Sequence, residues 1–60
     1  MKKSEVIRYA MLGALEEWDR ERTLLIENPH DENQRERFNR MNDKINELRS
    51  MQMKATLEEL

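Results

Sequence analysis

The apolar residues of this 60-residue chain follow a helical period in two separate segments. In the first segment they recur at steps of three, four and seven residues, at Ile7, Met11, Ala14, Trp18 and Leu25. At about 100° per residue these positions fall within roughly 60° of one another, which predicts an apolar stripe along one helix. The second segment alternates steps of three and four, the seam pattern of a coiled coil, at Phe38, Met41, Ile45, Leu48, Gln52 and Ala55.

The only proline of the chain, Pro29, lies between the two segments. A helix that continued through it would lose one hydrogen bond and press the ring against the carbonyl of Leu25, at a cost of about 3 kcal/mol. Seven residues beyond Leu25, the first stripe would reach the charged Glu32 and not an apolar residue. The two segments are therefore predicted to be separate helices joined by a turn.

Candidate capping residues stand at the expected helix starts. Ser4 suits the N-cap of the first helix. The second helix has two candidate starts: Asn28 as the cap with Pro29 at the first helical position, or Asp31 as the cap with Gln34 three residues later, a capping-box variant.

These signals predict an all-α fold, an antiparallel hairpin with helices at residues 4–27 and 31–58 in a single domain of residues 1–60. If partners lie equidistant from the turn, facing residues have numbers that add to 59, so that Trp18 faces Met41. The hairpin core is expected to consist of Ile7, Met11, Ala14, Trp18, Leu25, Phe38, Met41, Ile45 and Leu48.

The first helix carries more apolar surface than one neighbouring helix covers. Its apolar arc spans about 240°, whereas a helix packed against one partner needs only about 100°. A lone hairpin of this size is marginally stable, because ordering each residue costs about 1.5 kcal/mol and burying an aliphatic side chain contributes only about 1.5–3 kcal/mol. We therefore expect a homodimer in which two hairpins form a four-helix bundle. The expected oligomer interface is Val6, Ala10, Leu12, Gly13, Leu15, Leu24 and Ile26.

Composition narrows the chemistry and the location. The chain has no cysteine, which excludes disulfides and thiolate metal sites and fits a reducing compartment. Glu5 and Arg8 interrupt the only stretch that suggests a signal peptide, and no run approaches the ~20 apolar residues of a membrane span. We expect a cytoplasmic protein with no membrane partner.

No residues are expected to serve catalysis, a cofactor or a metal. The single histidine, His30, lies in the turn, and Pro29 breaks the helix on which Glu27 and His30 would have to form a metal-binding pair. Without cysteine and with few hydroxyl side chains, the chain offers no nucleophilic triad. Gly13 is the only glycine, so there is no phosphate-binding loop.

One polar stripe on the second helix has no carboxylate within about 80° of helical arc. Its residues are Arg35, Asn39, Asn42, Asn46 and Arg49. Asparagines beside a coiled-coil seam can fix register and partner choice, which is the favoured interpretation. Amide and guanidinium groups also hydrogen-bond bases and phosphates, so the stripe is a candidate face for a protein partner or for nucleic acid.

Together these features favour a small, non-enzymatic, homodimeric helical protein that binds another protein as an adaptor, regulator or inhibitor, of the kind common among phage, plasmid and bacterial accessory proteins. Two alternatives stay open. One is an RNA- or DNA-binding regulator that uses the polar stripe. The other is a structural subunit buried against a different chain.

Overall fold

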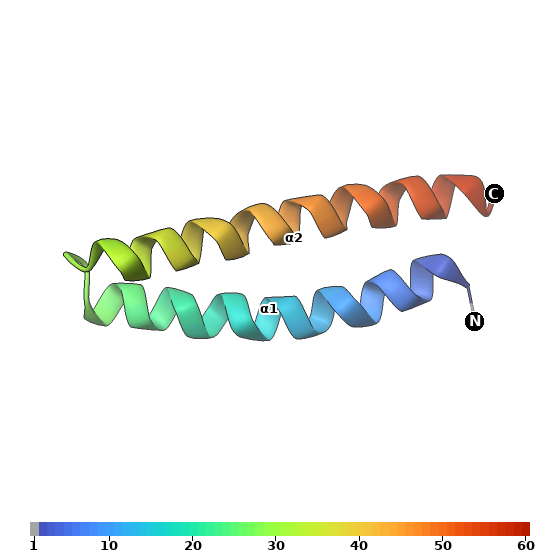
Figure 1. Cartoon of the computed structure of the whole chain (residues 1–60). Helices are drawn as coiled ribbons and strands as arrows, with labels where there is room; N and C mark the ends of the chain where they lie inside the picture. Colours follow the sequence, from blue (N-terminus) through green and yellow to red (C-terminus); the bar gives the residue numbers. More distant parts are fainter. Residues whose placement is uncertain (1) are drawn as a thin grey trace.

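The computed structural model describes residues 2–60, so Met1, which the predicted domain includes, lies outside the described residues. The chain forms two helices, α1 (Lys3–Glu27) and α2 (Glu32–Glu58), joined by a short turn. They run antiparallel with both termini at the same end (Figure 1). The predicted all-α hairpin is confirmed, and each helix begins within one residue of its predicted start.

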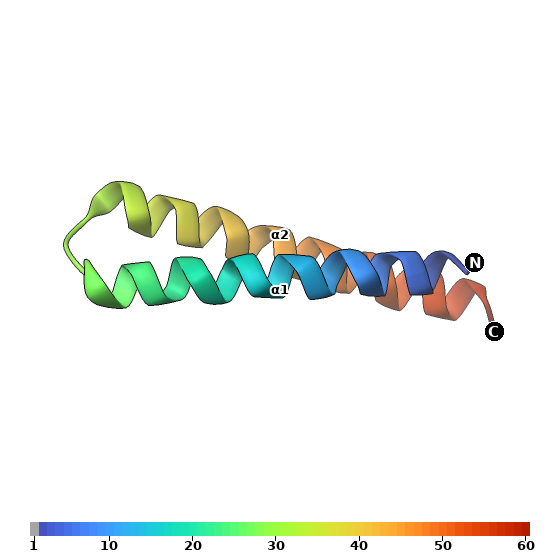
Figure 2. The same ribbon diagram turned by 90° about the horizontal axis from the view of Figure 1, so that it is seen from below.

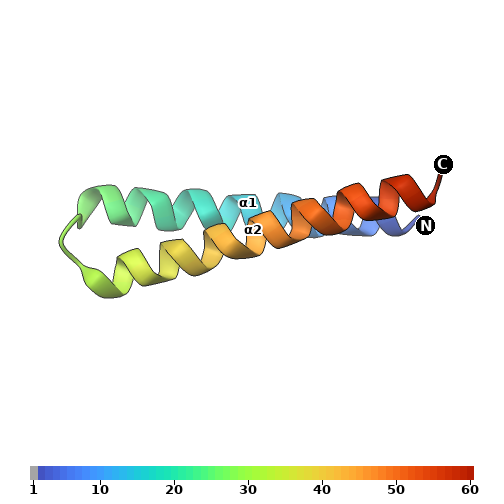
Figure 3. The same cartoon turned by 90° about the horizontal axis from the view of Figure 1, so that it is seen from above.

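The hairpin is long and thin. It measures 45 × 14 × 11 Å and has a radius of gyration of 13.9 Å, whereas a compact 60-residue domain would have about 10 Å. The views from below and from above show the helices inclined to each other at a shallow angle, as in coiled-coil pairs (Figures 2 and 3). Within residues 2–60, neither helix has an apolar stretch that would cross a bilayer.

The inward residues of both helices follow a continuous heptad seam. In α1 the buried or half-buried seam positions are Ser4, Ile7, Met11, Ala14, Trp18, Glu21 and Leu25. In α2 they are Gln34, Phe38, Met41, Ile45, Leu48, Gln52 and Ala55. Taken in opposite chain order, the seven positions of each helix add to 59, so the burial pattern is compatible with the register predicted from the turn.

The core is tightest in the middle of this seam. Ala14, Met41 and Ile45 form a buried cluster against which Trp18 and Leu48 pack. The small Ala14 side chain leaves room for the longer side chains of α2, so the two rows interdigitate. Each of the nine residues expected in the core is buried or half-buried.

The turn uses the second of the two predicted helix starts. The Asp31 carboxylate accepts hydrogen bonds from the backbone N–H groups of Asn33 (3.0 Å) and Gln34 (3.3 Å), which caps α2. Asn28 ends α1 instead of starting α2. Its backbone N–H and its side-chain amide both donate to the carbonyl of Leu24, at 2.9 and 3.1 Å.

The predicted N-cap of α1 is wrong. The cap position is Lys2, which makes no side-chain capping bond, and Ser4 lies inside the first turn. The Ser4 hydroxyl donates to Glu59 Oε2 (2.6 Å) and the Ser4 backbone N–H donates to Glu59 Oε1 (3.1 Å). A carboxylate from the other end of the chain thus binds a backbone N–H that the first helical turn leaves without an intrahelical partner.

A polar pair lies at the turn end of the seam. Gln34 is only 4% exposed, and its side-chain amide donates to the backbone carbonyl of Glu21 (3.1 Å) and to the Glu21 carboxylate. A buried amide without a partner is destabilising by about 1–3 kcal/mol, so Glu21 makes Gln34 tolerable inside the hairpin.

Candidate functional site

The seam separates two long faces of the hairpin. Trp18 Nε1 donates to Asn42 Oδ1 at 3.2 Å, and the guanidinium of Arg22 lies 5.7 Å from the centre of the Trp18 ring. Arg22 of α1 and Asn42 of α2 therefore border the seam on the same side. Residues seven apart share an edge of a heptad helix, so this side also carries Arg8 and Leu15.

We call this surface the Asn/Arg face. Its residues on α1 are Glu5, Arg8, Leu12, Leu15, Asp19, Arg22 and Ile26, and those on α2 are Arg35, Asn39, Asn42, Asn46, Arg49, Met53 and Thr56. The same seven-residue spacing defines the surface on the other side of the seam, which we call the small-residue face. Its residues on α1 are Lys3, Val6, Ala10, Gly13, Glu17, Arg20, Leu24 and Glu27, and those on α2 are Arg37, Arg40, Lys44, Glu47, Met51, Lys54 and Glu58.

The seven residues expected at an oligomer interface divide between these two faces. Leu12, Leu15 and Ile26 lie on the Asn/Arg face, where they are 54%, 39% and 66% exposed. The small-residue face has the other four, of which Val6 is 52% exposed and Leu24 is half-buried. Because the faces point in opposite directions, one flat partner covers only one of the two sets.

The polar stripe on α2 is exposed along its whole length, and two of its five residues bond within the hairpin. Asn42 accepts the hydrogen bond from the Trp18 indole. Arg35 Nη2 donates to the carbonyl oxygen of Pro29 at 3.1 Å, which links α2 to the turn. The Asn42 contact joins the two helices and favours a role for the stripe in fixing the register of the hairpin, while Asn39, Asn46 and Arg49 remain exposed.

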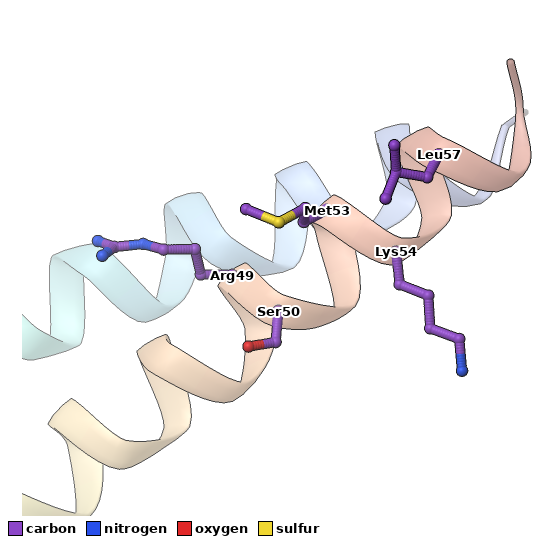
Figure 4. Close-up of a pocket in the computed structure, with 5 residues that line it drawn as sticks. All are labelled: Arg49, Ser50, Met53, Lys54 and Leu57. Carbon is purple, nitrogen blue, oxygen red and sulfur yellow. The ribbon is translucent and has the colours of Figure 1, made fainter.

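A shallow apolar groove of about 300 Å³ lies near the C-terminal end of the Asn/Arg face, lined by Arg49, Ser50, Met53, Lys54 and Leu57. Arg49, Met53 and Leu57 follow one edge of α2, whereas Ser50 and Lys54 project from its other side (Figure 4). Met53 and Leu57 are each 64% exposed. Leu57 was not among the predicted site residues, although its four-residue step from Met53 was an available signal.

The opposite edge of α2 carries a basic cluster. Arg37, Arg40 and Lys44 surround a hollow beside Met41. Successive members are three or four residues apart, so their positive charges lie on the same side of the helix. This cluster makes the small-residue side of α2 positive over residues 37–44, and the carboxylates of Glu47 and Glu58 follow on the same side towards the C-terminus.

The bonds between Ser4 and Glu59 join the two helices at the open end of the hairpin. The Ser4 hydroxyl and the Ser4 backbone N–H hold the pKa of the Glu59 carboxyl below its ordinary value, and the nearby positive charge of Lys2 acts in the same direction. The ionised carboxylate accepts both bonds, so the contact depends on its charge.

Acidification is expected to open this end of the hairpin. Because the folded pKa of Glu59 is depressed, its contribution to stability is present above the unfolded pKa and is lost as the pH falls through the folded value. Between about pH 6 and pH 2, NMR should show the Ser4 amide signal moving together with the titration of Glu59. Glu59→Gln should remove this movement, and Glu58→Gln, a change at the adjacent exposed residue, should preserve it. A Ser4 signal that is insensitive to pH would contradict the expectation.

The described residues 2–60 offer extended surfaces and no site at which reactive groups converge. No three histidine, aspartate or glutamate side chains among them gather at a point suited to a metal ion, and His30 is exposed in the turn. Gly13 also faces open space, since a Cβ placed there would meet nothing within 4 Å. Comparison of the chain with protein-family models, curated proteins and solved structures finds no match.

Proposed function

We propose that two copies of the hairpin pack through their small-residue faces into a twofold four-helix bundle, and that this dimer is a non-enzymatic protein-binding module acting as an adaptor, regulator or inhibitor. The observation that carries the proposal is the exposed area. The chain exposes 4976 Å², whereas a compact monomer of its mass, 7.4 kDa, would expose about 4,200 Å². The difference of roughly 800 Å² is the area that each partner buries in a standard protein interface.

Charge favours the small-residue face for self-association. A twofold interface places a face against itself, so like charges on that face meet. On the Asn/Arg face, the rows next to the seam contain four arginines and no carboxylate: Arg8, Arg22, Arg35 and Arg49. On the small-residue face, the corresponding rows contain both signs, with Lys3, Arg37 and Lys44 against Glu17 and Glu58. Self-pairing is therefore less repulsive on the small-residue face.

The apolar side chains of the small-residue face also suit a helix contact. Ala10 and Gly13 are exposed and small, which allows the backbone of another helix to approach closely. Val6 and Met51 are 52% and 44% exposed, so a second copy would remove their remaining apolar area from water. Burial of this kind is the main favourable term in protein association.

The binding role is supported by the apolar residues of the Asn/Arg face that would stay exposed on the dimer. With the small-residue faces together, the Asn/Arg faces lie on the two outer surfaces of the bundle. They still expose Leu12, Ile26 and Met53, which are 54%, 66% and 64% accessible in the hairpin. Large exposed apolar patches on soluble proteins mark interaction sites.

Sedimentation equilibrium at micromolar concentration tests the dimer. The unmodified chain should have twice its monomer mass of 7.4 kDa. Ala10→Glu should convert it to monomers, because a carboxylate would be buried in the contact without a built partner. Leu12→Glu, the matched change on the Asn/Arg face, should leave the dimer intact. A folded monomer for the unmodified chain, or dissociation by Leu12→Glu alone, would contradict the proposal.

A further inference from the structure

We infer that the Asn/Arg face is the docking site for an amphipathic helix of a partner protein, with an apolar stripe bordered by aspartate or glutamate. The inference rests on the proposed binding role and adds the chemistry of the partner. An amphipathic helix can lay its apolar side against exposed apolar residues, and Leu12 of α1 with Met53 and Leu57 of α2 provide such residues here. Each docked helix would extend the hairpin into a three-helix layer.

The apolar anchors for such a helix lie at one end of the Asn/Arg face. If Met11 and Leu48 are level in the seam, the next residues, Leu12 and Arg49, lie about 3 Å apart along the hairpin axis, at 1.5 Å per residue in opposite directions. Leu12 is 54% exposed on the α1 side, and Met53 is 64% exposed one turn beyond Arg49 on the α2 side. The apolar groove continues to Leu57.

The length of this region sets the length of the partner. The stretch from Asn46 to Leu57 covers about 16 Å of helix at 1.5 Å per residue. A partner helix of about three turns, or roughly eleven residues, would span it. Methionine at position 53 adds adaptability, since its unbranched side chain repacks against different apolar shapes.

The arginines that flank the apolar residues of the Asn/Arg face favour a partner helix with negatively charged side chains. The Asn/Arg face has two carboxylates, Glu5 and Asp19, against four arginines, and neither carboxylate lies in the rows next to the seam. Arg35 donates to the neutral carbonyl of Pro29, and Arg22 lies over the Trp18 ring, so these two contacts do not cancel the positive charge. Carboxylates on both borders of a docked helix would meet guanidinium groups and form charge-assisted hydrogen bonds. A lysine-bordered helix would meet repulsion.

The same surface fits a helix better than a nucleic acid. Arginine and asparagine alone would suit phosphates and base edges. Leu12, Leu15 and Met53, however, expose aliphatic surface among the arginines, and the sugar–phosphate backbone does not cover such surface well. The net charge of the chain, −2, also gives no general attraction to a polyanion.

Trp18 provides a built-in reporter for docking on this face. It is the only tryptophan of the chain, and it is half-buried in the seam. Its indole N–H binds Asn42 and its ring contacts Arg22, both residues of the Asn/Arg face. A docked helix that extends beyond Asn46 as far as Asn42 should alter the Trp18 emission, whereas a helix confined to residues 46–57 should not.

The experiment uses the full chain and two synthetic helical peptides with the same leucine stripe, one bordered by glutamate and one by lysine, both without tryptophan. Fluorescein anisotropy of the peptides reports binding, and Trp18 emission reports whether the docked helix extends as far as Asn42. The glutamate peptide should bind at least about tenfold more tightly, a difference of roughly 1.4 kcal/mol. Its affinity should fall as NaCl rises from about 50 to 300 mM, because the border contacts are exposed to solvent.

Charge reversal on the face provides the decisive variant. Arg8→Glu combined with Arg49→Glu should invert the preference towards the lysine peptide by about tenfold. The matched control, Arg20→Glu combined with Arg40→Glu, makes the same net charge change with one substitution on each helix, on the small-residue side, and sedimentation of this variant reports any effect on the dimer. The control should keep the preference for the glutamate peptide. Circular dichroism confirms that both variants are helical.

Equal affinity for the two peptides, or inversion by the control as well as by the Arg8/Arg49 variant, would overturn the inference. A fluorescein-labelled single-stranded RNA that binds more tightly than the glutamate peptide, and loses binding in the Arg8/Arg49 variant, would assign the face to nucleic acid. The dimer is measured separately by sedimentation. A monomer that still shows the inversion would refute only the proposed self-association, whereas a dimer without peptide binding would refute only the docking site.

Discussion

Ile45→Ala is expected to unfold most of the chain at 25 °C and micromolar concentration. Ile45 is 5% exposed in the central cluster with Ala14 and Met41, and no nearby loop is available to collapse into the space it would leave. Truncation of a buried isoleucine to alanine costs about 2–5 kcal/mol, the transfer term plus the cavity term. A core of this size rarely supplies more than about 3–5 kcal/mol in total. The single change therefore removes a stability comparable to that of the whole hairpin.

Urea titration followed by circular dichroism measures this effect. Met53→Ala is the matched control, because it truncates a similar aliphatic side chain that is 64% exposed, and it should shift the stability by less than about 0.5 kcal/mol. Raising the protein concentration should partly restore the helicity of Ile45→Ala if dimerisation is coupled to folding. An unfolding midpoint equal to that of the unmodified chain would contradict the assignment of Ile45 to the structural centre.

The elements that the sequence predicts correctly are those that depend on neighbours in the chain. Pro29 must break a helix wherever it stands, because it lacks the N–H donor and its ring meets the preceding turn. Asp31 caps α2 with backbone groups two and three residues away, so its role is also local. The apolar steps through Met41, Ile45 and Leu48 predict one helical face for the same reason.

The polar residues of the seam could not be predicted from hydropathy. Glu21 and Gln34 occupy heptad positions that extend the stripes next to Trp18 and Phe38, but a polar side chain gives no apolar signal there. Only the partner across the hairpin makes Gln34 an inward residue. Ser4 was assigned to local capping for a related reason, because its partner Glu59 is 55 residues away in the chain.

The sequence alone does not show that the exposed apolar residues of α1 lie on two different faces of the hairpin, because that depends on how α1 packs against α2. A helical wheel of α1 shows one wide apolar arc. It does not show how the two edges of that arc are placed relative to the edges of α2. The contacts of Trp18 with Asn42 and Arg22 supply that information, since they place one edge of each helix on a common face. This placement separates Leu12 from Ala10, two residues that the sequence alone assigned to the same interface.

The second prediction with a large expected effect concerns the stability contributed by the polar pair of Glu21 and Gln34 near the turn. Replacing Glu21 and Gln34 together by leucine is expected to raise the stability of the hairpin by about 1–4 kcal/mol, because two desolvated polar groups give way to apolar contact. Gln34→Leu alone should give less, since it adds apolar burial but leaves the half-buried Glu21 without its amide donor. Urea denaturation of both single variants and the double variant forms a cycle that isolates the coupling between the two residues.

The more stable double variant should adopt more than one helix register or oligomeric state. The amide–carboxylate pair is satisfied only when Glu21 and Gln34 lie side by side, so it penalises slipped registers and hairpins that open to exchange helices with another chain. A leucine pair imposes no such penalty, because leucine packs acceptably against many apolar neighbours. The double variant should therefore melt at a higher temperature and yet show mixed oligomers in sedimentation and duplicated amide signals in NMR. A double variant that is more stable and still gives one sharp set of signals at the mass of the unmodified chain would show that the apolar seam and the turn alone fix the register.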